Sequence, residues 1–143
     1  MSRYDGVTLE RVVKQARTVA VVGASDNPQR PSNEVARYLH AQGLRIFPVN
    51  PKLESLFGLP AFGSLAEIGE PVDIVDVFRR PSATPEVAEQ AVAAGAGTLW
   101  LQLGVINDEA ARIAERGGLT VIMDRCLAVE HRRLLRTSSG PHG

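Results

Sequence analysis

The sequence predicts a Rossmann-like α/β domain, doubly wound around a mainly parallel sheet with helices on both faces. Three observations predict this class. Strand-like and helix-like segments alternate along the chain, as right-handed crossover connections require. Residues 72–78 (VDIVDVF) are mostly apolar, which is typical of a strand covered on both faces. The 143 residues are 44% hydrophobic, which is enough for one core.

The first third of the chain predicts a helix, a strand and a second helix. Thr8 is a suitable N-cap, and apolar residues follow it at i, i+3, i+4 and i+7: Leu9, Val12, Val13 and Ala16. Residues 18–22 (TVAVV) then form a strand that runs directly into Gly23. A second helix is expected from Asn33 to Gly43, where the glycine suits the C′ position.

The middle of the chain is the least regular part. A second strand is expected at residues 44–49, where Asn50 and Pro51 stop it. Residues 52–62 predict a loop with a very short strand. Capping-box spacing from Ser64 then predicts a helix of one or two turns before the third strand.

The last third continues the alternation. The Thr-Pro-Glu start of residues 84–95 is typical of a helix N-terminus. A strand is expected at residues 98–103 (TLWLQL), a helix at 107–117, a strand at 119–123 and a helix around 128–135.

One domain over residues 1–136 contains all these elements, and we expect the small, polar tail at 137–143 to be disordered. Sixteen basic residues balance 16 acidic ones, so no global field draws the protein to nucleic acid or to a membrane surface. No apolar run approaches the roughly 18 to 20 residues that span a bilayer. The one cysteine, Cys126, cannot form an internal disulfide, which fits a cytoplasmic location. The sequence leaves protein partners and the oligomeric state open.

The carboxyl ends of the strands argue against a dinucleotide. The first loop has only Gly23 where a dinucleotide site has GxGxxG. The second strand ends in Asn50 and Pro51 rather than in an acidic residue that would hold a ribose hydroxyl, and Lys52 would instead favour a phosphate. No Walker motif is present, so the sequence gives no support for nucleoside triphosphate hydrolysis.

Six short motifs follow one another at or beside the strand ends: VAVVGAS, PQRPS, PVNP, VDVFRRP, WLQLGV and MDRC. Together they resemble the small single-domain coenzyme A-binding proteins, relatives of the CoA-binding domain of the succinyl-CoA synthetase alpha chain. The resemblance covers about residues 15–135. It implies CoA or an acyl-CoA as the ligand, lying across the carboxyl edge of the sheet. Its phosphates would lie near the first loop and its adenosine end near the loop after the second strand.

The contacts that the resemblance implies all lie in loops at this edge of the sheet. They are Gly23, Ala24, Ser25, Arg30, Pro31, Ser32, Asn50, Pro51, Lys52, Phe78, Arg79, Arg80, Pro81, Leu103 and Gly104.

Two classes of function remain from the sequence. The first is a non-catalytic module that binds CoA for storage, sensing or transfer to a partner. The second is an enzyme of acyl-CoA or nucleotide metabolism with its chemistry near Asp124 or Cys126. The sequence pairs no base with a nucleophile, which favours the first class. We expect His40 and His131 to be surface residues and Trp100 to belong to the core, and no metal site is expected.

Overall fold

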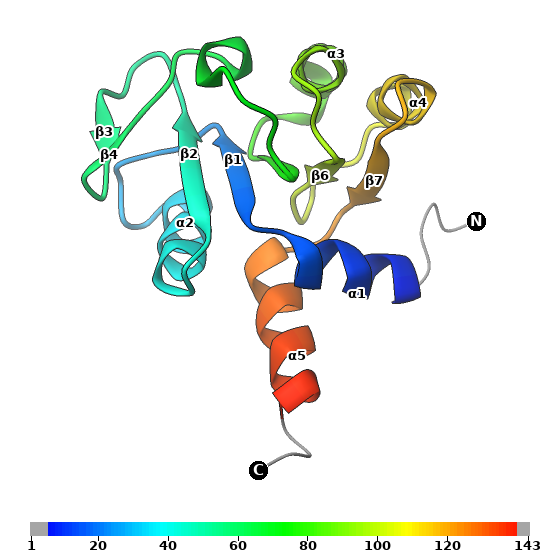
Figure 1. Cartoon of the computed structure of the whole chain (residues 1–143). Helices are drawn as coiled ribbons and strands as arrows, with labels where there is room; N and C mark the ends of the chain where they lie inside the picture. The colour runs from blue at the N-terminus through cyan, green and yellow to red at the C-terminus, as the bar shows by residue number, and fades with distance from the viewer. Residues whose placement is uncertain (1–5, 140–143) are drawn as a thin grey trace.

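Five parallel strands form the central sheet of the computed structural model, which describes residues 6–139 (Figure 1). Their order across the sheet is β2-β1-β5-β6-β7. The strands are β1 Thr18–Val22, β2 Arg45–Val49, β5 Ile74–Val77, β6 Thr98–Leu101 and β7 Thr120–Met123. The helices are α1 Gly6–Gln15, α2 Pro31–Ala41, α3 Thr84–Ala93, α4 Asp108–Arg116 and α5 Leu127–Ser139. The predicted Rossmann-like fold is confirmed.

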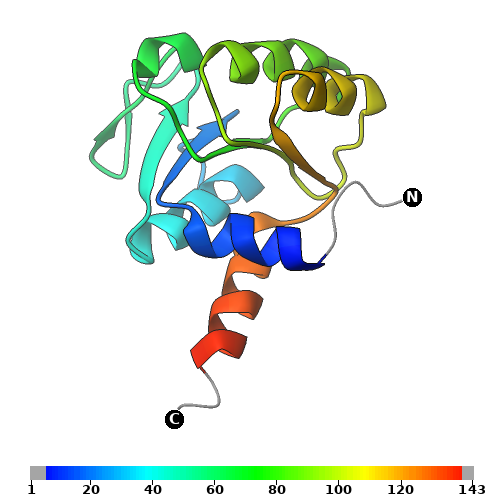
Figure 2. The ribbon, with the colours of Figure 1, turned by 45° about the vertical axis from the view of Figure 1, so that its right-hand side comes forward.

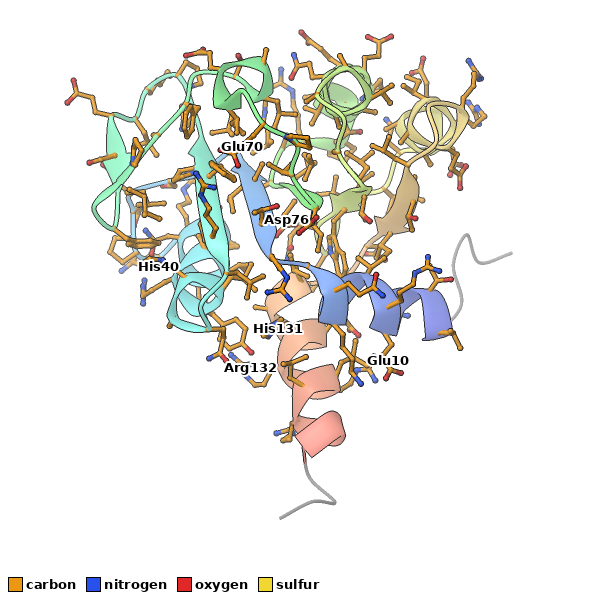
Figure 3. The ribbon with its side chains drawn as sticks, viewed as in Figure 1. Glu10, His40, Glu70, Asp76, His131 and Arg132 are labelled. Carbon is orange, nitrogen blue, oxygen red and sulfur yellow. The ribbon has the colours of Figure 1, made fainter. Side chains whose placement is uncertain are left out.

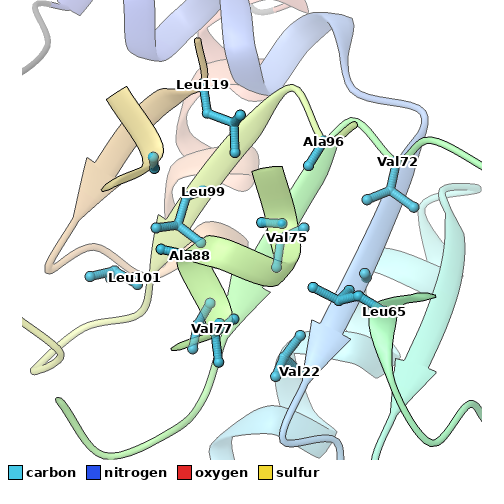
Figure 4. Close-up of a cluster of buried hydrophobic side chains, with 14 of the residues drawn as sticks. Val22, Leu65, Val72, Val75, Val77, Ala88, Ala96, Leu99, Leu101 and Leu119 are labelled. Carbon is cyan, nitrogen blue, oxygen red and sulfur yellow. The ribbon is translucent and has the colours of Figure 1, made fainter. Parts of the chain in front are cut away.

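Helices cover both faces of this sheet. Figures 1 and 2 show α3 and α4 above it and α1, α2 and α5 below it. The strand residues alternate between the two layers because successive side chains of a strand point to opposite faces. Val75 and Leu99 pack with Ala88 on the α3 side, as Figure 4 shows. Val21, Ile74 and Trp100 belong to the other cluster, and each is at most 1% exposed.

The strand order reverses at β1. The chain passes from β1 to β2 on one side and then returns to place β5 on the other side of β1. The register aligns β1 with both neighbours, since Val22 pairs with Val49 and with Val77. In open α/β sheets, ligands bind in the crevice outside the strand ends at such a reversal. The fold therefore places its candidate crevice between the loops that follow β1 and β5.

Short elements fill the connection from β2 to β5. Residues 52–62 hold a hairpin of two-residue strands, β3 Ser55–Leu56 and β4 Leu59–Pro60. The 3-10 helix η1 Leu65–Ile68 follows Ser64, where a short helix was expected. A second 3-10 turn, η2 Pro81–Ala83, precedes α3. Across residues 6–139, no helix combines the length and the apolar character needed to cross a bilayer.

Two helix boundaries differ from the prediction. Helix α2 begins at Pro31 rather than Asn33, because proline at the first helical position has a suitable φ and needs no donor there. Helix α5 continues to Ser139, so residues 137–139, which were expected in the tail, belong to this helix. Residues 140–143 lie outside the described part of the chain.

Asp76 is a buried carboxyl group in the middle of the sheet (Figure 3). It is 0% exposed, and neither of its carboxylate oxygens has a hydrogen-bond partner among the described residues. Burial disfavours the charged form and raises the pKa of this carboxyl well above its usual value. Asp73, the residue just before β5, is exposed and accepts hydrogen bonds from the backbone N–H groups of Arg17 and Thr18, at 2.7 and 3.1 Å.

Candidate functional site

A cavity of about 430 Å³ lies at the reversal point, between the carboxyl ends of β1, β5 and β6 and the start of α2. Most of the residues predicted as contacts line it. The lining residues are Gly23, Ala24, Ser25, Arg30, Pro31, Ser32, Asn50, Phe78, Arg79, Gln102, Leu103 and Val105. We call this cavity the edge pocket.

Gly23 brings two of these loops into contact. Its φ of +89° is a left-handed conformation that favours glycine, and its N–H donates to the carbonyl of Val49 at 3.0 Å. A Cβ at this position would lie 2.4 Å from the carbonyl oxygen of Phe78. The loop after β1 can therefore lie against the end of β5 only because residue 23 has no side chain.

Two asparagine side chains hold the first loop in shape. The Asn50 Nδ2 donates to the carbonyl of Ala24 at 2.8 Å, and its Oδ1 accepts from the N–H of Lys52 at 2.9 Å. From α2, the Asn33 Nδ2 donates to the carbonyl of Ser25 at 2.9 Å. The side chain of Asn50 thus links the loops after β1 and β2, and it is a positioning residue of the edge pocket.

The charge of the edge pocket is positive. Arg30 and Arg79 line it, both are exposed, and neither forms a salt bridge within the described part of the chain. Pro31 and Ser32 open helix α2 at the same cavity, where the helix N-terminus adds partial positive charge. No carboxylate is among the lining residues. The pocket therefore suits an anionic ligand, although the chain as a whole has no net charge.

Several predicted contacts lie outside the edge pocket. Arg80 Nε donates to the hydroxyl of Ser82 at 3.2 Å, and Gly104 N–H donates to the Asp124 carboxylate at 2.7 Å. Pro51 and Lys52, in the turn after β2, are exposed and do not line the cavity. The residues that do not line the pocket are Pro51, Lys52, Arg80, Pro81 and Gly104.

Two lining residues were not predicted, Gln102 and Val105. Gln102 was assigned to a strand over residues 98–103, but β6 ends at Leu101, so Gln102 belongs to the edge of the sheet. It is only 6% exposed, and its Oε1 has no hydrogen-bond partner among the described residues. A polar amide at the end of the apolar run TLWL was the signal in the sequence that could have indicated it.

The region near Asp124 and Cys126 shows structural contacts rather than a catalytic pair. The Asp124 carboxylate is engaged by the Gly104 N–H, and the Cys126 thiol is half-buried. Trp100 is fully buried, as predicted, and its Nε1 donates to the carbonyl of Arg125 at 2.8 Å. Within residues 6–139, no group of three His, Cys, Asp or Glu side chains is placed to hold a metal ion.

A second cavity of about 330 Å³ adjoins the edge pocket between α2 and α5. His131 on α5 is 5% exposed, so its predicted surface position was wrong. α5 packs against α1 and α2, which covers this ring. The Tyr38 hydroxyl and His131 Nδ1 are 2.9 Å apart, and burial lowers the pKa of His131. The Arg132 guanidinium lies 4.6 Å from the centre of the Tyr38 ring; Figure 3 labels both α5 residues.

Comparison with known proteins identifies relatives over almost the whole chain. The family described as CoA binding domain matches residues 17–132. The uncharacterized protein YneT of Bacillus subtilis is 41% identical over 131 residues, which cover 92% of this chain and 97% of that protein. An ADP-forming acetate–CoA ligase of Archaeoglobus fulgidus is 24% identical over 79% of this chain, but the match covers only 18% of the ligase.

Solved structures agree with this result. A protein from Thermus thermophilus superposes with a TM-score of 0.85 at 43% identity, covering 94% of this chain and 99% of that one. A hypothetical protein from Pyrococcus horikoshii gives a TM-score of 0.87 at 35% identity, covering 94% and 93% of the two chains.

Proposed function

The chain belongs to the family of CoA binding domains, and we propose that it binds coenzyme A or an acyl-CoA in the edge pocket. In this proposal the protein is a non-catalytic module for binding, sensing or carrying the ligand. The phosphates lie against the first loop and the N-terminus of α2, and the adenosine end lies toward the loop after β2.

The observation that carries the proposal is the charge of the edge pocket. CoA has a pyrophosphate and a further phosphate on its ribose, so it needs cations and free N–H groups and tolerates no nearby carboxylate. Arg30, Arg79 and the N-terminus of α2 supply the positive charge, and the lining contains no acidic residue. At the end of β2, Asn50 stands where a dinucleotide site places an acidic residue.

The non-catalytic part of the proposal has separate support. The matched ligase is a much longer protein, and this chain corresponds to 18% of it, so the ligase activity is not carried over. Asp124 is engaged by a backbone N–H rather than by Cys126. An enzyme of acyl-CoA or nucleotide metabolism with chemistry at these two residues is the alternative. A cytoplasmic location remains a prediction from the single cysteine.

Thermal unfolding with added ligands tests the binding proposal. We expect a dissociation constant of about 1 μM for CoA, roughly 8 kcal/mol. CoA at about 100 times that concentration then stabilises the fold by roughly 2.7 kcal/mol. NAD should stabilise it far less, because it lacks the additional phosphate. Equal stabilisation by NAD and CoA would contradict the proposal, and release of free thiol from acetyl-CoA would favour the enzyme.

A further inference from the structure

The 330 Å³ cavity between α2 and α5 adjoins the edge pocket, because Pro31, Gln102 and Leu103 line both. Its character is different. Where the edge pocket carries two arginines, this cavity is walled mainly by apolar side chains, and Glu34 and Arg132 are its only charged lining residues. The apolar and aromatic lining residues are Val35, Tyr38, Leu103, Cys126, Ala128 and Val129. We call it the apolar pocket.

Apolar side chains around this pocket are unusually open to solvent. Leu103 is 66% exposed and Val129 is 51% exposed, and these are two of the most exposed large hydrophobic residues in the described part of the chain. They come from different elements, the loop after β6 and helix α5, and both line the same cavity. A ligand that covers them removes apolar surface from water, which stabilises the complex.

Gln102 stands where the two pockets meet. It is more than nine-tenths buried, it lines both cavities, and its Oε1 accepts no hydrogen bond from the described residues. A buried amide oxygen without a donor is unfavourable until a donor reaches it. The thiol arm of CoA contains two amide groups, and their N–H groups are donors of the required kind. The Oε1 atom is itself shielded from solvent, so the amide must rotate toward the cavities to meet such a donor, and Gln102 then marks the path of that arm.

The polar group of the apolar pocket is already engaged. The Tyr38 hydroxyl is hydrogen-bonded to His131, and Arg132 lies over the Tyr38 ring. Apart from Gln102 and the exposed side chains of Glu34 and Arg132, the rest of the lining is apolar or aromatic. The wall thus suits an uncharged acyl chain better than a second polar group.

We propose that the apolar pocket receives the acyl group of an acyl-CoA, whose thiol arm passes Gln102 on its way from the edge pocket. This inference rests on the proposed function, and it specifies a ligand class: thioesters with short, uncharged aliphatic chains. Free CoA would bind in the edge pocket and leave Val129, which lines the apolar pocket alone, exposed.

A chain-length series measures the inference directly. Calorimetric titration with CoA and with acetyl-, butyryl- and hexanoyl-CoA should show dissociation constants that fall along the series. The expected factor is up to about fourfold for each methylene group that leaves water, until the cavity is full. Equal constants across the series would overturn the inference.

Three variants test where the effect arises. Val129→Phe fills the cavity from the surface of α5 and should remove the dependence on chain length. Val7→Phe, a matched change at a 76% exposed position on α1, should retain it.

Gln102→Met should stabilise the free protein and weaken binding of every CoA species, since the unsatisfied oxygen and its proposed ligand contact are both lost. A gain in stability without any loss of affinity would contradict the path past Gln102.

Cys126 provides a second readout that does not depend on affinity. It is the single cysteine of the chain and lines the apolar pocket, so alkylation by iodoacetamide reports on that cavity alone. Hexanoyl-CoA at saturation should slow the alkylation more than CoA does. If CoA binds but the acyl group changes neither affinity nor labelling, only the apolar pocket is refuted. If no CoA species binds, the proposed function fails as well.

Discussion

The two edges of the sheet use their polar groups differently. At the amino edge, the Asp73 carboxylate accepts from two backbone N–H groups, and the Thr18 hydroxyl accepts from the Asp73 N–H at 2.9 Å. Arg45, at the start of β2, pairs with Glu70 at 3.0 Å. At the carboxyl edge, Arg79 has no salt-bridge partner and the Gln102 Oε1 has no donor among the described residues.

This contrast separates a stabilising edge from the edge at which we propose that the ligand binds. A larger cavity of about 490 Å³ opens between η1 and the end of α3, and Glu70 lines it while no cation does. Size alone would favour that cavity, but its charge is wrong for phosphates. Unpaired cations and an unsatisfied amide are better indications of a ligand than volume is. The following predictions test the contrast, from the largest expected effect to the smallest.

Gly23→Ala should cost the most stability, about 3 kcal/mol or more. The new Cβ meets the Phe78 carbonyl, and the φ of +89° strains any residue with a side chain. Gly104→Ala is the matched control, because its φ is +86° and open space surrounds its Cβ position. We expect it to cost about 1 kcal/mol. Urea denaturation compares them, and similar losses would mean that the loops are not in close contact.

Asp76→Val should stabilise the protein at neutral pH, by roughly 2 kcal/mol. The variant removes a buried polar group that has no partner and fits an apolar strand. The folded-state pKa of Asp76 is raised, so the wild-type stability that this group contributes is fully present below its unfolded pKa. This contribution to stability is lost as the pH rises through the pKa of Asp76 in the folded protein.

The advantage of the valine variant should therefore grow with increasing pH above about 4. Denaturation between pH 4 and pH 8 measures the trend, with the exposed Asp26→Ala as the control. An advantage that is constant over this range would show that the Asp76 carboxyl does not ionise more readily in the unfolded chain.

Arg79→Ala should weaken CoA binding by about 1 to 2 kcal/mol, less than a buried phosphate contact because the guanidinium is exposed. Arg80→Ala should weaken it less, since this neighbour lies outside the edge pocket and contacts Ser82. Calorimetric titration gives both values. Folding should change by less than about 0.5 kcal/mol in either variant, and equal losses of affinity would assign both arginines to the ligand.

Asp73→Ala tests the amino edge and should cost about 1 kcal/mol of stability while leaving the affinity for CoA unchanged. The variant removes the acceptor of two backbone N–H groups. Because Asp73 is exposed, water can replace the carboxylate as the acceptor, which keeps the loss small. Asp73→Asn is the matched variant, because its amide oxygen can still accept. A change in CoA affinity from either variant would mean that the two edges are coupled.

Lys52→Ala should have the smallest effect, at most about 1 kcal/mol, because Lys52 is exposed and lies off the wall of the edge pocket. If it contacts the ribose phosphate, the loss should disappear with dephospho-CoA. Titrations of wild type and variant with both ligands form the cycle. If the losses of affinity from Lys52→Ala and from removal of the ribose phosphate are additive, Lys52 does not contact that phosphate.

The sequence predicted the order of the elements because their periodicities are local. It also predicted the edge at which Gly23 and Arg79 meet, since parallel strands bring their ends together. It did not predict where β6 ends. That end depends on pairing with β5 and β7, which stops at Leu101 with Val77 and Met123 as partners. The position of Gln102 at the edge of the sheet therefore depends on the strand register, which no local sequence pattern specifies.

Side-chain contacts could not be predicted from the sequence either. Asp73 and Asp76 are identical residues three positions apart, and only the packed structure shows that one is satisfied and the other is buried without a partner. Lys52, a contact implied by the family resemblance, lies in a turn closed by the Asn50 side chain and does not line the edge pocket, so this contact stays a prediction.

The side chain of Asn50 has a consequence for how fast a ligand binds. By joining the loops after β1 and β2 through Ala24 and Lys52, it fixes two walls of the edge pocket before any ligand arrives. A preformed site needs no slow rearrangement, so the observed association rate should rise linearly with CoA concentration without reaching a plateau. Asn50→Ala releases both loops, and stopped-flow traces of that variant should show a second, concentration-independent phase.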